Sequence, residues 1–146
     1  MEKVISAFWS VLELCSQLLF WKACFQPKVQ KREYLMAVIA VWMLNQLYIN
    51  RGLASEWITA LTLLLYIVVS YLINKGKWYQ HILAVFVVTG LSGIIDTIFL
   101  YGASSVIGIS VAELVWRKLL YVVIVTSGKL FLLLFAWIFY RFPVFR

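Results

Sequence analysis

Five long apolar stretches, separated by short polar turns, dominate the hydrophobic pattern of the chain. They cover residues 4–25, 34–50, 57–74, 81–101 and 119–140. A helix needs about 20 apolar residues to cross the roughly 30 Å hydrocarbon core of a bilayer. The pattern therefore predicts an all-α, polytopic membrane protein, with one domain over residues 1–146 and a bundle of about five transmembrane helices. Because the second stretch is short and the link before the last stretch is apolar, counts of four and six stay open.

Composition supports this fold class. The 146 residues are 64% hydrophobic and only 13% charged, whereas ordinary soluble domains are about 45–50% apolar and about 25% charged. In a soluble protein the formal net charge of +7 would suggest nucleic-acid binding. Here the basic residues stand in short loops beside apolar stretches, so we expect no nucleic-acid partner and interpret them as determinants of membrane orientation.

The distribution of lysine and arginine predicts that orientation. One set of loops contains Lys22, Lys28, Lys31, Arg32, Lys75, Lys77, Arg141 and Arg146, and the other contains Lys3, Arg51, Arg117 and Lys118. Short loops rich in lysine and arginine stay in the cytoplasm. We therefore expect a multi-pass cell-membrane protein with its N-terminus outside and its C-terminus in the cytoplasm, surrounded by membrane lipids.

A polar stripe runs along the first apolar stretch. Its members are spaced by four, three and four positions, which places them on one face of a helix: Ser6, Ser10, Glu13 and Gln17. Polar side chains are costly against lipid. The stripe is therefore predicted to face other helices of the bundle.

Lys129 lies near the middle of the last apolar stretch, where an unpaired ammonium group is costly. Glu13 lies at a similar depth, and Asn45 and Asp96 lie nearer the outer face. We predict that these four residues converge and that Lys129 pairs with Glu13 or Asp96. Three interpretations follow: an ion pair that only fixes helix packing, a polar pocket that binds a ligand from the outer face, or a carboxylate that couples to protons.

Two weaker patterns lie in the fourth stretch. Thr89, Gly93 and Thr97 repeat every four positions, a spacing of small residues that favours close helix packing. His81 follows an aromatic, basic turn and is predicted to be an anchor at the membrane interface.

The longest connection covers residues 102–116. Its later part, residues 104–116, is apolar enough to lie at the membrane interface or to re-enter the membrane as a short helix. Glu113 and Arg117 are four positions apart there and are predicted to pair.

Several chemistries lack the residues that they need. Cys15 and Cys24 lie about 13 Å apart along one predicted helix, which is too far for a disulfide. With these cysteines and His81 as the only histidine, the chain offers no set of zinc ligands. Motifs for nucleophilic catalysis, phosphate binding or metalloprotease activity are absent from the sequence. We therefore expect no enzyme activity, no cofactor and no metal.

The order of the polar motifs resembles a known family. A basic, proline-containing turn at residues 27–32 is followed by a close helical pair, the Lys75-Gly76-Lys77 turn, Asp96 late in the fourth stretch and Ser127-Gly128-Lys129 in the last. This order is similar to the N-terminal sensor region of GHKL-family histidine kinases, which include peptide receptors of the accessory-gene-regulator type. Two departures are that such sensors commonly have six spans, and that no phosphoacceptor or ATP-binding segment is found up to Arg146.

The resemblance implies a bacterial two-component signalling protein. It would detect an extracellular signal such as a peptide and pass a helix movement to a cytoplasmic kinase, usually as a homodimer. Glu13, Asn45, Asp96 and Lys129 would form the ligand site. Two alternatives are a small proton-coupled transporter or channel that uses Glu13, and a structural membrane subunit.

Overall fold

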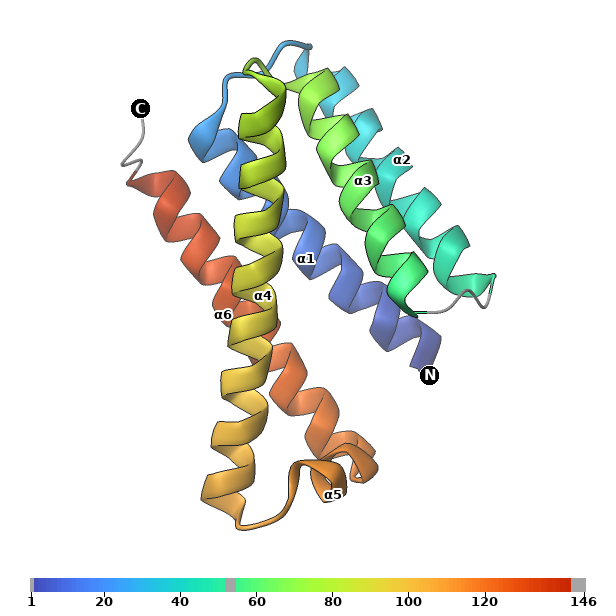
Figure 1. The fold of residues 1–146 in the computed structure, drawn as a ribbon, viewed down its shortest axis with the longest axis vertical. Coiled ribbons are helices and arrows are strands. Elements are labelled where there is room, and N and C mark those ends of the chain that lie inside the picture. The colour runs from blue at the N-terminus through green and yellow to red at the C-terminus, as the bar shows by residue number, and fades with distance from the viewer. Residues whose placement is uncertain (1, 52–54, 143–146) are drawn as a thin grey trace.

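The chain folds into a helical bundle. A computed structural model describes residues 2–51 and 55–142, and over these residues the fold is all-α (Figure 1). The helices are α1 (Glu2–Cys24), α2 (Lys31–Asn50), α3 (Ser55–Ile73), α4 (Trp78–Ile107), α5 (Val111–Trp116) and α6 (Lys118–Arg141). The all-α part of the predicted fold class is thereby confirmed.

Four of the described helices are long and apolar enough to cross a membrane: α1, α3, α4 and α6. The helix α2 is not among them, although it has 20 residues. It begins with Lys31, Arg32 and Glu33, and Asn45 and Gln46 lie near its end. The apolar part between them would extend for only about 17 Å as a helix. Four candidate spans, identified by length and composition, agree with the predicted multi-pass fold, and a fifth span remains a prediction.

The helix α4 is longer than the apolar pattern indicated. It continues past Tyr101 to Ile107, for 30 residues in all, and ends where Gly108 adopts a left-handed conformation with φ of 78°. Glycine takes this conformation without the steric cost that a side chain imposes, so it is a favourable residue for ending a helix.

The centre of the bundle consists of α1, α4 and α6 (Figure 1). The helices α1 and α6 run in the same direction, because Trp9 bonds to Thr126 and Phe20 stacks on Phe139. The helix α4 runs opposite to both. The α2–α3 hairpin packs against α1 and α4.

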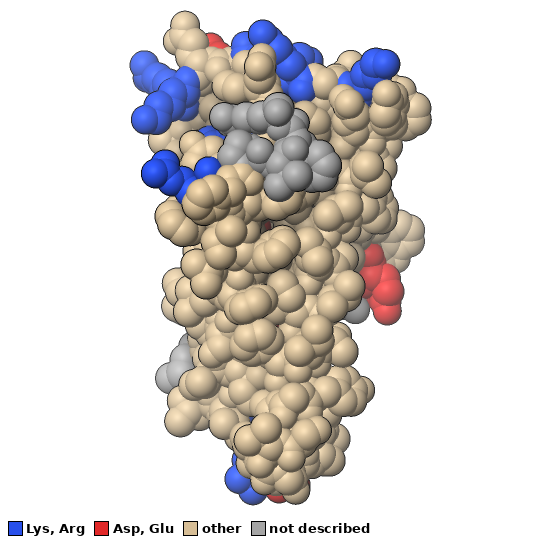
Figure 2. Space-filling model, turned by 90° about the vertical axis from the view of Figure 1, so that its left-hand side faces the viewer, with Lys and Arg blue, Asp and Glu red and all other residues tan. Residues whose placement is uncertain are grey.

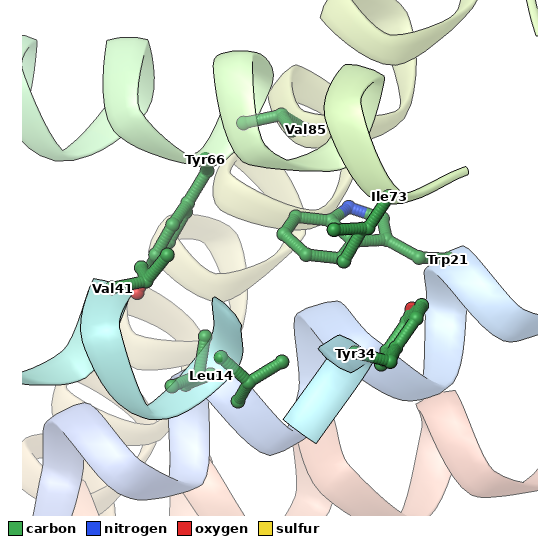
Figure 3. Packing of buried hydrophobic residues seen from close by; sticks show 8 residues of the cluster. Leu14, Trp21, Tyr34, Val41, Tyr66, Ile73 and Val85 are labelled. Carbon is green, nitrogen blue, oxygen red and sulfur yellow. The ribbon is translucent and has the colours of Figure 1, made fainter. Parts of the chain in front are cut away.

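The α2–α3 hairpin is attached through a cluster of buried apolar and aromatic side chains (Figure 3). Its members are Leu14, Trp21, Tyr34, Val38, Val41, Tyr66, Ile73 and Val85. Trp21 is fully buried, and its ring meets the ring of Tyr66 edge to face with centroids 6.2 Å apart. Edge-to-face pairs contribute about 0.5–1.5 kcal/mol beyond the apolar area that they bury.

Two turns are hydrogen-bonded to each other at one end of the bundle. The amide of Lys28 donates to the carbonyl of Ile73 at 2.8 Å, and the amide of Lys75 donates to the carbonyl of Gln26 at 2.7 Å. These bonds join the α1–α2 turn, residues 26–30, to the α3–α4 turn, residues 74–77. We call this end of the molecule the basic end.

His81 lies beneath these two turns and is fully buried. Its Nδ1 is 2.8 Å from the hydroxyl of Ser70, and its ring stacks on Phe25 with centroids 4.4 Å apart. The prediction that His81 anchors the chain at the membrane interface was therefore wrong, because the joined turns cover the ring. His81 packs the inside of the turn pair instead.

Basic side chains gather at the basic end, and a smaller charged group lies at the opposite end (Figure 2). The predicted grouping holds for the described members Lys22, Lys28, Lys31, Arg32, Lys75, Lys77 and Arg141. Arg146 lies outside the described residues. The start of α1 and the end of α6 lie at opposite ends of the bundle (Figure 1). Which of the two ends faces the cytoplasm remains a prediction.

The connection before α6 contains the short helix α5, as the sequence indicated. The hydroxyl of Ser110 caps α5 by accepting from the amide of Glu113 at 3.2 Å. The predicted pair of Glu113 and Arg117 is present, with 3.1 Å between the carboxylate and the guanidinium. Both side chains are exposed, so the pair adds little stability.

Candidate functional site

A buried charge network joins the three central helices. The ammonium nitrogen of Lys129 on α6 lies 2.5 Å from Oε1 of Glu13 on α1 and 2.8 Å from Oδ2 of Asp96 on α4. The side chain of Lys129 is only 8% exposed. A charge in such a position needs partners, and Lys129 has two. The predicted convergence is confirmed for Glu13, Asp96 and Lys129, and the ion pair forms with both acids.

Ser92 completes this network and was missed from the sequence. Its hydroxyl accepts from Lys129 at 3.0 Å and donates to Oε1 of Glu13 at 3.1 Å. Ser92 lies four positions before Asp96, so both project from the same face of α4. The spacing of four positions between Ser92 and the membrane carboxylate Asp96 was the sequence signal that could have identified Ser92.

Gly128 lets α6 approach α4 beside the network. A Cβ atom at this position would lie 3.3 Å from Oδ1 of Asp96 and 3.7 Å from Ile95. Glycine places no atom there, so the backbone next to Lys129 comes close to Asp96. Gly128 thus allows α6 and α4 to approach closely, and the next residue, Lys129, supplies the charge that contacts Asp96.

Of the predicted small-residue seam on α4, Thr89 faces α1 and accepts from Gln17, whereas Gly93 and Thr97 do not pack against the described helices. Gly93 and Thr97 are exposed, and a Cβ atom at Gly93 would have no neighbour within 4 Å. The hydroxyl of Thr97 donates to the carbonyl of Gly93 in its own helix. The packed face lies one position away and contains Ser92. The prediction failed for Gly93 and Thr97 because threonine and glycine are compatible with lipid contact as well as with helix contact.

A cavity of about 250 Å³ lies between α1, α2, α3 and α4, next to the charge network. Its polar lining residues are Ser10, Glu13, Gln17, Asn45, Thr59, Thr62, Thr89 and Ser92. Tyr66 and several aliphatic side chains line the rest. The predicted stripe on α1 thus faces protein, because Ser10, Glu13 and Gln17 all line this cavity.

The four predicted site residues divide between the cavity and the network. Glu13 belongs to both, since it lines the cavity and bonds to Lys129. Asn45 lines the cavity and accepts from the hydroxyl of Thr62 at 2.8 Å. Asp96 and Lys129 are not among the cavity lining. Ser92 also belongs to both, so Glu13 and Ser92 connect the two parts.

Gln17 crosses the cavity wall from α1 to α4. Its side-chain amide nitrogen donates to the hydroxyl of Thr89 at 3.3 Å. The residue is 2% exposed, and its Oε1 has no hydrogen-bond partner in the described part of the chain. Buried polar atoms in folded proteins generally have a partner, so this oxygen is an unsatisfied acceptor enclosed in the wall of the cavity.

The cavity lies in the half of the bundle away from the basic end. Asn45 and Ile49 come from the last turns of α2, and Ile58 and Thr59 come from the first turns of α3. The hydrogen-bonded turns lie at the other ends of these two helices. Under the predicted orientation, the cavity therefore lies toward the outside.

The cavity is lined mainly by hydrogen-bonding groups on its polar side. Across residues 2–51 and 55–142, no group of three His, Cys, Asp or Glu side chains is placed to hold a metal ion. The cavity offers one carboxylate, side-chain amides and hydroxyl groups. These groups are suited to hydrogen bonding with a polar ligand.

No protein family model, characterised protein or solved structure matches the chain. The similarity to GHKL sensor regions therefore rests on the motifs in the sequence. Function has to be argued from the geometry of the cavity and the charge network.

Proposed function

We propose that this chain is a non-catalytic sensor domain of the cell membrane. It binds an extracellular signal, such as a peptide, in the cavity and transmits a helix movement through α6 to a cytoplasmic kinase. The order of basic turns and membrane charges that resembles GHKL sensor regions supports this assignment. By the same resemblance, the sensor works as a homodimer.

The observation that carries the proposal is the double role of Glu13. The same carboxylate lines the cavity and accepts from Lys129 on α6. A ligand that contacts Glu13 therefore changes the environment of a charge on the last helix. Because α6 continues from Lys129 to Arg141 at the basic end, its movement would reach the side assigned to the cytoplasm.

Signal transmission needs two arrangements of α6 that differ in affinity for the ligand. A ligand shifts an equilibrium only by the difference between its binding free energies for the two states. In one arrangement Lys129 bonds to both acids, as observed. In the other, a ligand at Glu13 weakens one of these bonds, and α6 moves relative to α1.

Distance measurements between α4 and α6 test this mechanism. Spin labels would be placed through Tyr79→Cys and Tyr140→Cys in a chain whose Cys15 and Cys24 are replaced by alanine. The labelled protein would be reconstituted in nanodiscs. Peptide fractions from the growth medium of cells that produce the protein would then be added to it. We expect at least one fraction to shift the distance distribution.

Variants decide whether the charge network mediates the shift. We expect Asp96→Asn and Lys129→Met to reduce it, and Glu113→Gln, which alters an exposed carboxylate on α5, to keep it. A shift that persists in both network variants, or no shift with any fraction, contradicts the proposal.

A proton-coupled transporter is the second candidate, and the exposure of Glu13 favours it. The Glu13 side chain is 40% exposed, against 27% for Asp96, so a substrate in the cavity can reach it. Transport predicts proton-driven flux in liposomes that is lost in Glu13→Gln. Absence of flux alongside a ligand-dependent distance change would favour the sensor.

A further inference from the structure

We propose that the cavity binds the ammonium group of a small ligand, which shares Glu13 with Lys129. This inference deepens the sensor proposal and rests on it for the consequence at α6. The binding chemistry itself follows from the charges and hydrogen-bonding groups of the cavity.

The charges at the cavity favour a cationic ligand. Among the described residues that line the cavity, Glu13 carries the formal charge, and neither lysine nor arginine is present. Glu13 and Asp96, which lies behind the wall, together face the single ammonium group of Lys129. With all three groups ionised, one negative charge is in excess, and a cationic ligand neutralises it. An anionic ligand would add to the excess at low dielectric, which is costly.

The hydrogen-bond acceptors at the cavity favour a ligand with N–H donors. Oε1 of Gln17 is a buried acceptor without a partner in the part of the chain that is described, and Gln17 lines the cavity. Glu13 is an acceptor when ionised. Oε1 of Gln17 lacks a donor, whereas Glu13 already accepts from Lys129 and Ser92 and has lone pairs left for a further donor. A primary ammonium group carries three N–H donors, so it suits these acceptors better than a quaternary ammonium or an ether.

The carboxylate of Glu13 is accessible to a ligand in the cavity. Oε1 of Glu13 already accepts from Lys129 and from Ser92. Its side chain is nevertheless the most exposed of the three ionic groups in the network. A ligand ammonium in the cavity can therefore approach this carboxylate while Lys129 keeps its 2.8 Å contact with Asp96. The ligand would thus take over part of the role of Lys129 at α1.

Size limits the ligand portion that enters. A cavity of about 250 Å³ holds an aminoalkyl group or the amino end of a longer chain, and it does not hold a folded partner. Free amines and the amino terminus of a peptide share this chemistry. A free amine would bind alone, whereas a peptide terminus would lose affinity on acetylation.

The experiment compares four small polar probes on the unaltered protein in nanodiscs. Ethanolammonium carries the proposed group, ethylene glycol replaces it with a hydroxyl, glycolate replaces it with an anion, and choline retains the charge without N–H donors. Binding is followed through the NMR methyl signals of Thr62 and Thr89, which line the cavity. Because a hydrogen bond to a charged group is stronger than one between neutral groups, ethanolammonium should bind at least about tenfold more tightly than the other three.

A matched pair of variants locates the effect. Glu13→Gln should reduce the preference for ethanolammonium over ethylene glycol at least about tenfold, and Glu113→Gln should keep it. The probe comparison on the unaltered protein does not depend on the folding of either variant. A glycine-rich peptide with a free amino terminus and its acetylated form then separate the two ligand sources.

The outcomes also separate this inference from the sensor proposal. Equal or tighter binding of ethylene glycol or glycolate, no saturable binding of ethanolammonium, or a preference that survives Glu13→Gln would overturn the ammonium site. If the α4–α6 distance still responds to a peptide fraction in those cases, the sensor proposal stands. Ammonium binding without any distance change would support the site and reject the sensor.

Discussion

Lys129 and Glu13 are 116 positions apart in the chain, yet their charged groups are 2.5 Å apart in the bundle. This contact joins the last helix to the first. Asp96 on α4 provides the second partner at 2.8 Å. The three helices at the centre of the bundle are thus linked by one ammonium group and two carboxylates.

Removal of the ammonium group should destabilise the bundle. Lys129→Met leaves two carboxylates close together without a cation, and breaking a buried pair costs about 3–5 kcal/mol. Because Glu13 is 40% exposed, we expect the lower part of that range. Unfolding in detergent mixtures measures the loss, and Lys75→Met at an exposed turn position is the control.

The same network makes a second, compensating prediction. Adding Glu13→Gln and Asp96→Asn to Lys129→Met removes the uncompensated charges, so much of the lost stability should return. A triple variant that is less stable than Lys129→Met alone would show that the charges do not account for the destabilisation.

Gly128 and Gly93 form a matched pair for helix packing. Gly128→Ala places a methyl group 3.3 Å from Oδ1 of Asp96, and the overpacking should cost about 1–3 kcal/mol. Gly93→Ala meets no atom within 4 Å and should stabilise its helix by up to about 1 kcal/mol. Thermal unfolding of the two variants side by side checks the prediction, and equal effects would contradict it.

Gly76 closes the turn over His81 in a conformation that other residues rarely adopt. Its φ is 148°, and a Cβ atom there would lie 3.1 Å from Nε2 of His81. Gly76→Ala should therefore loosen the joined turns and speed trypsin cleavage after Lys75 and Lys77. Gly102→Ala, which meets no atom within 4 Å, should leave the cleavage rate unchanged. Unchanged cleavage in Gly76→Ala would show that the turn accommodates the methyl group.

Cysteine labelling tests the orientation and the role of α2. In a chain with Cys15→Ala and Cys24→Ala, a membrane-impermeant reagent added to intact cells should label Arg51→Cys and not Lys75→Cys. Lys31→Cys should behave like Lys75→Cys, because the turn before Lys31 is hydrogen-bonded to the turn that contains Lys75. If Arg51→Cys is labelled and Lys31→Cys is not, α2 crosses the membrane between these two positions. Labelling of Lys31→Cys together with Arg51→Cys from outside would remove α2 from the spans.

The apolar pattern predicted the helices well because helix formation in a membrane depends on local sequence. Every backbone group in lipid has to be hydrogen-bonded within its own segment, which an apolar helix achieves by itself. The bounds of α1, α3 and α6 followed from this rule. The end of α4 did not, because Gly102 left the helix intact and Gly108 ended it.

The charge network was predictable in kind and not in detail. A lysine within an apolar stretch needs a partner, and few acids were available, so Glu13 and Asp96 were named from sequence. Ser92 was missed because a serine is common in membrane helices and does not demand a partner as a charge does. Its neighbour Gly93 was assigned to packing instead, although adjacent positions on a helix differ in direction by about 100°.

The sequence by itself determined the all-α fold, five apolar stretches of which four form the candidate spans α1, α3, α4 and α6, and the need for a partner at Lys129. These features depend on local hydrogen bonding and on the cost of a bare charge in lipid. Only the tertiary structure decided that both acids reach Lys129, that Glu13 also faces a cavity, and that His81 is buried. These features depend on how helices distant in the chain rotate and cross, and that choice is made by packing of the whole bundle.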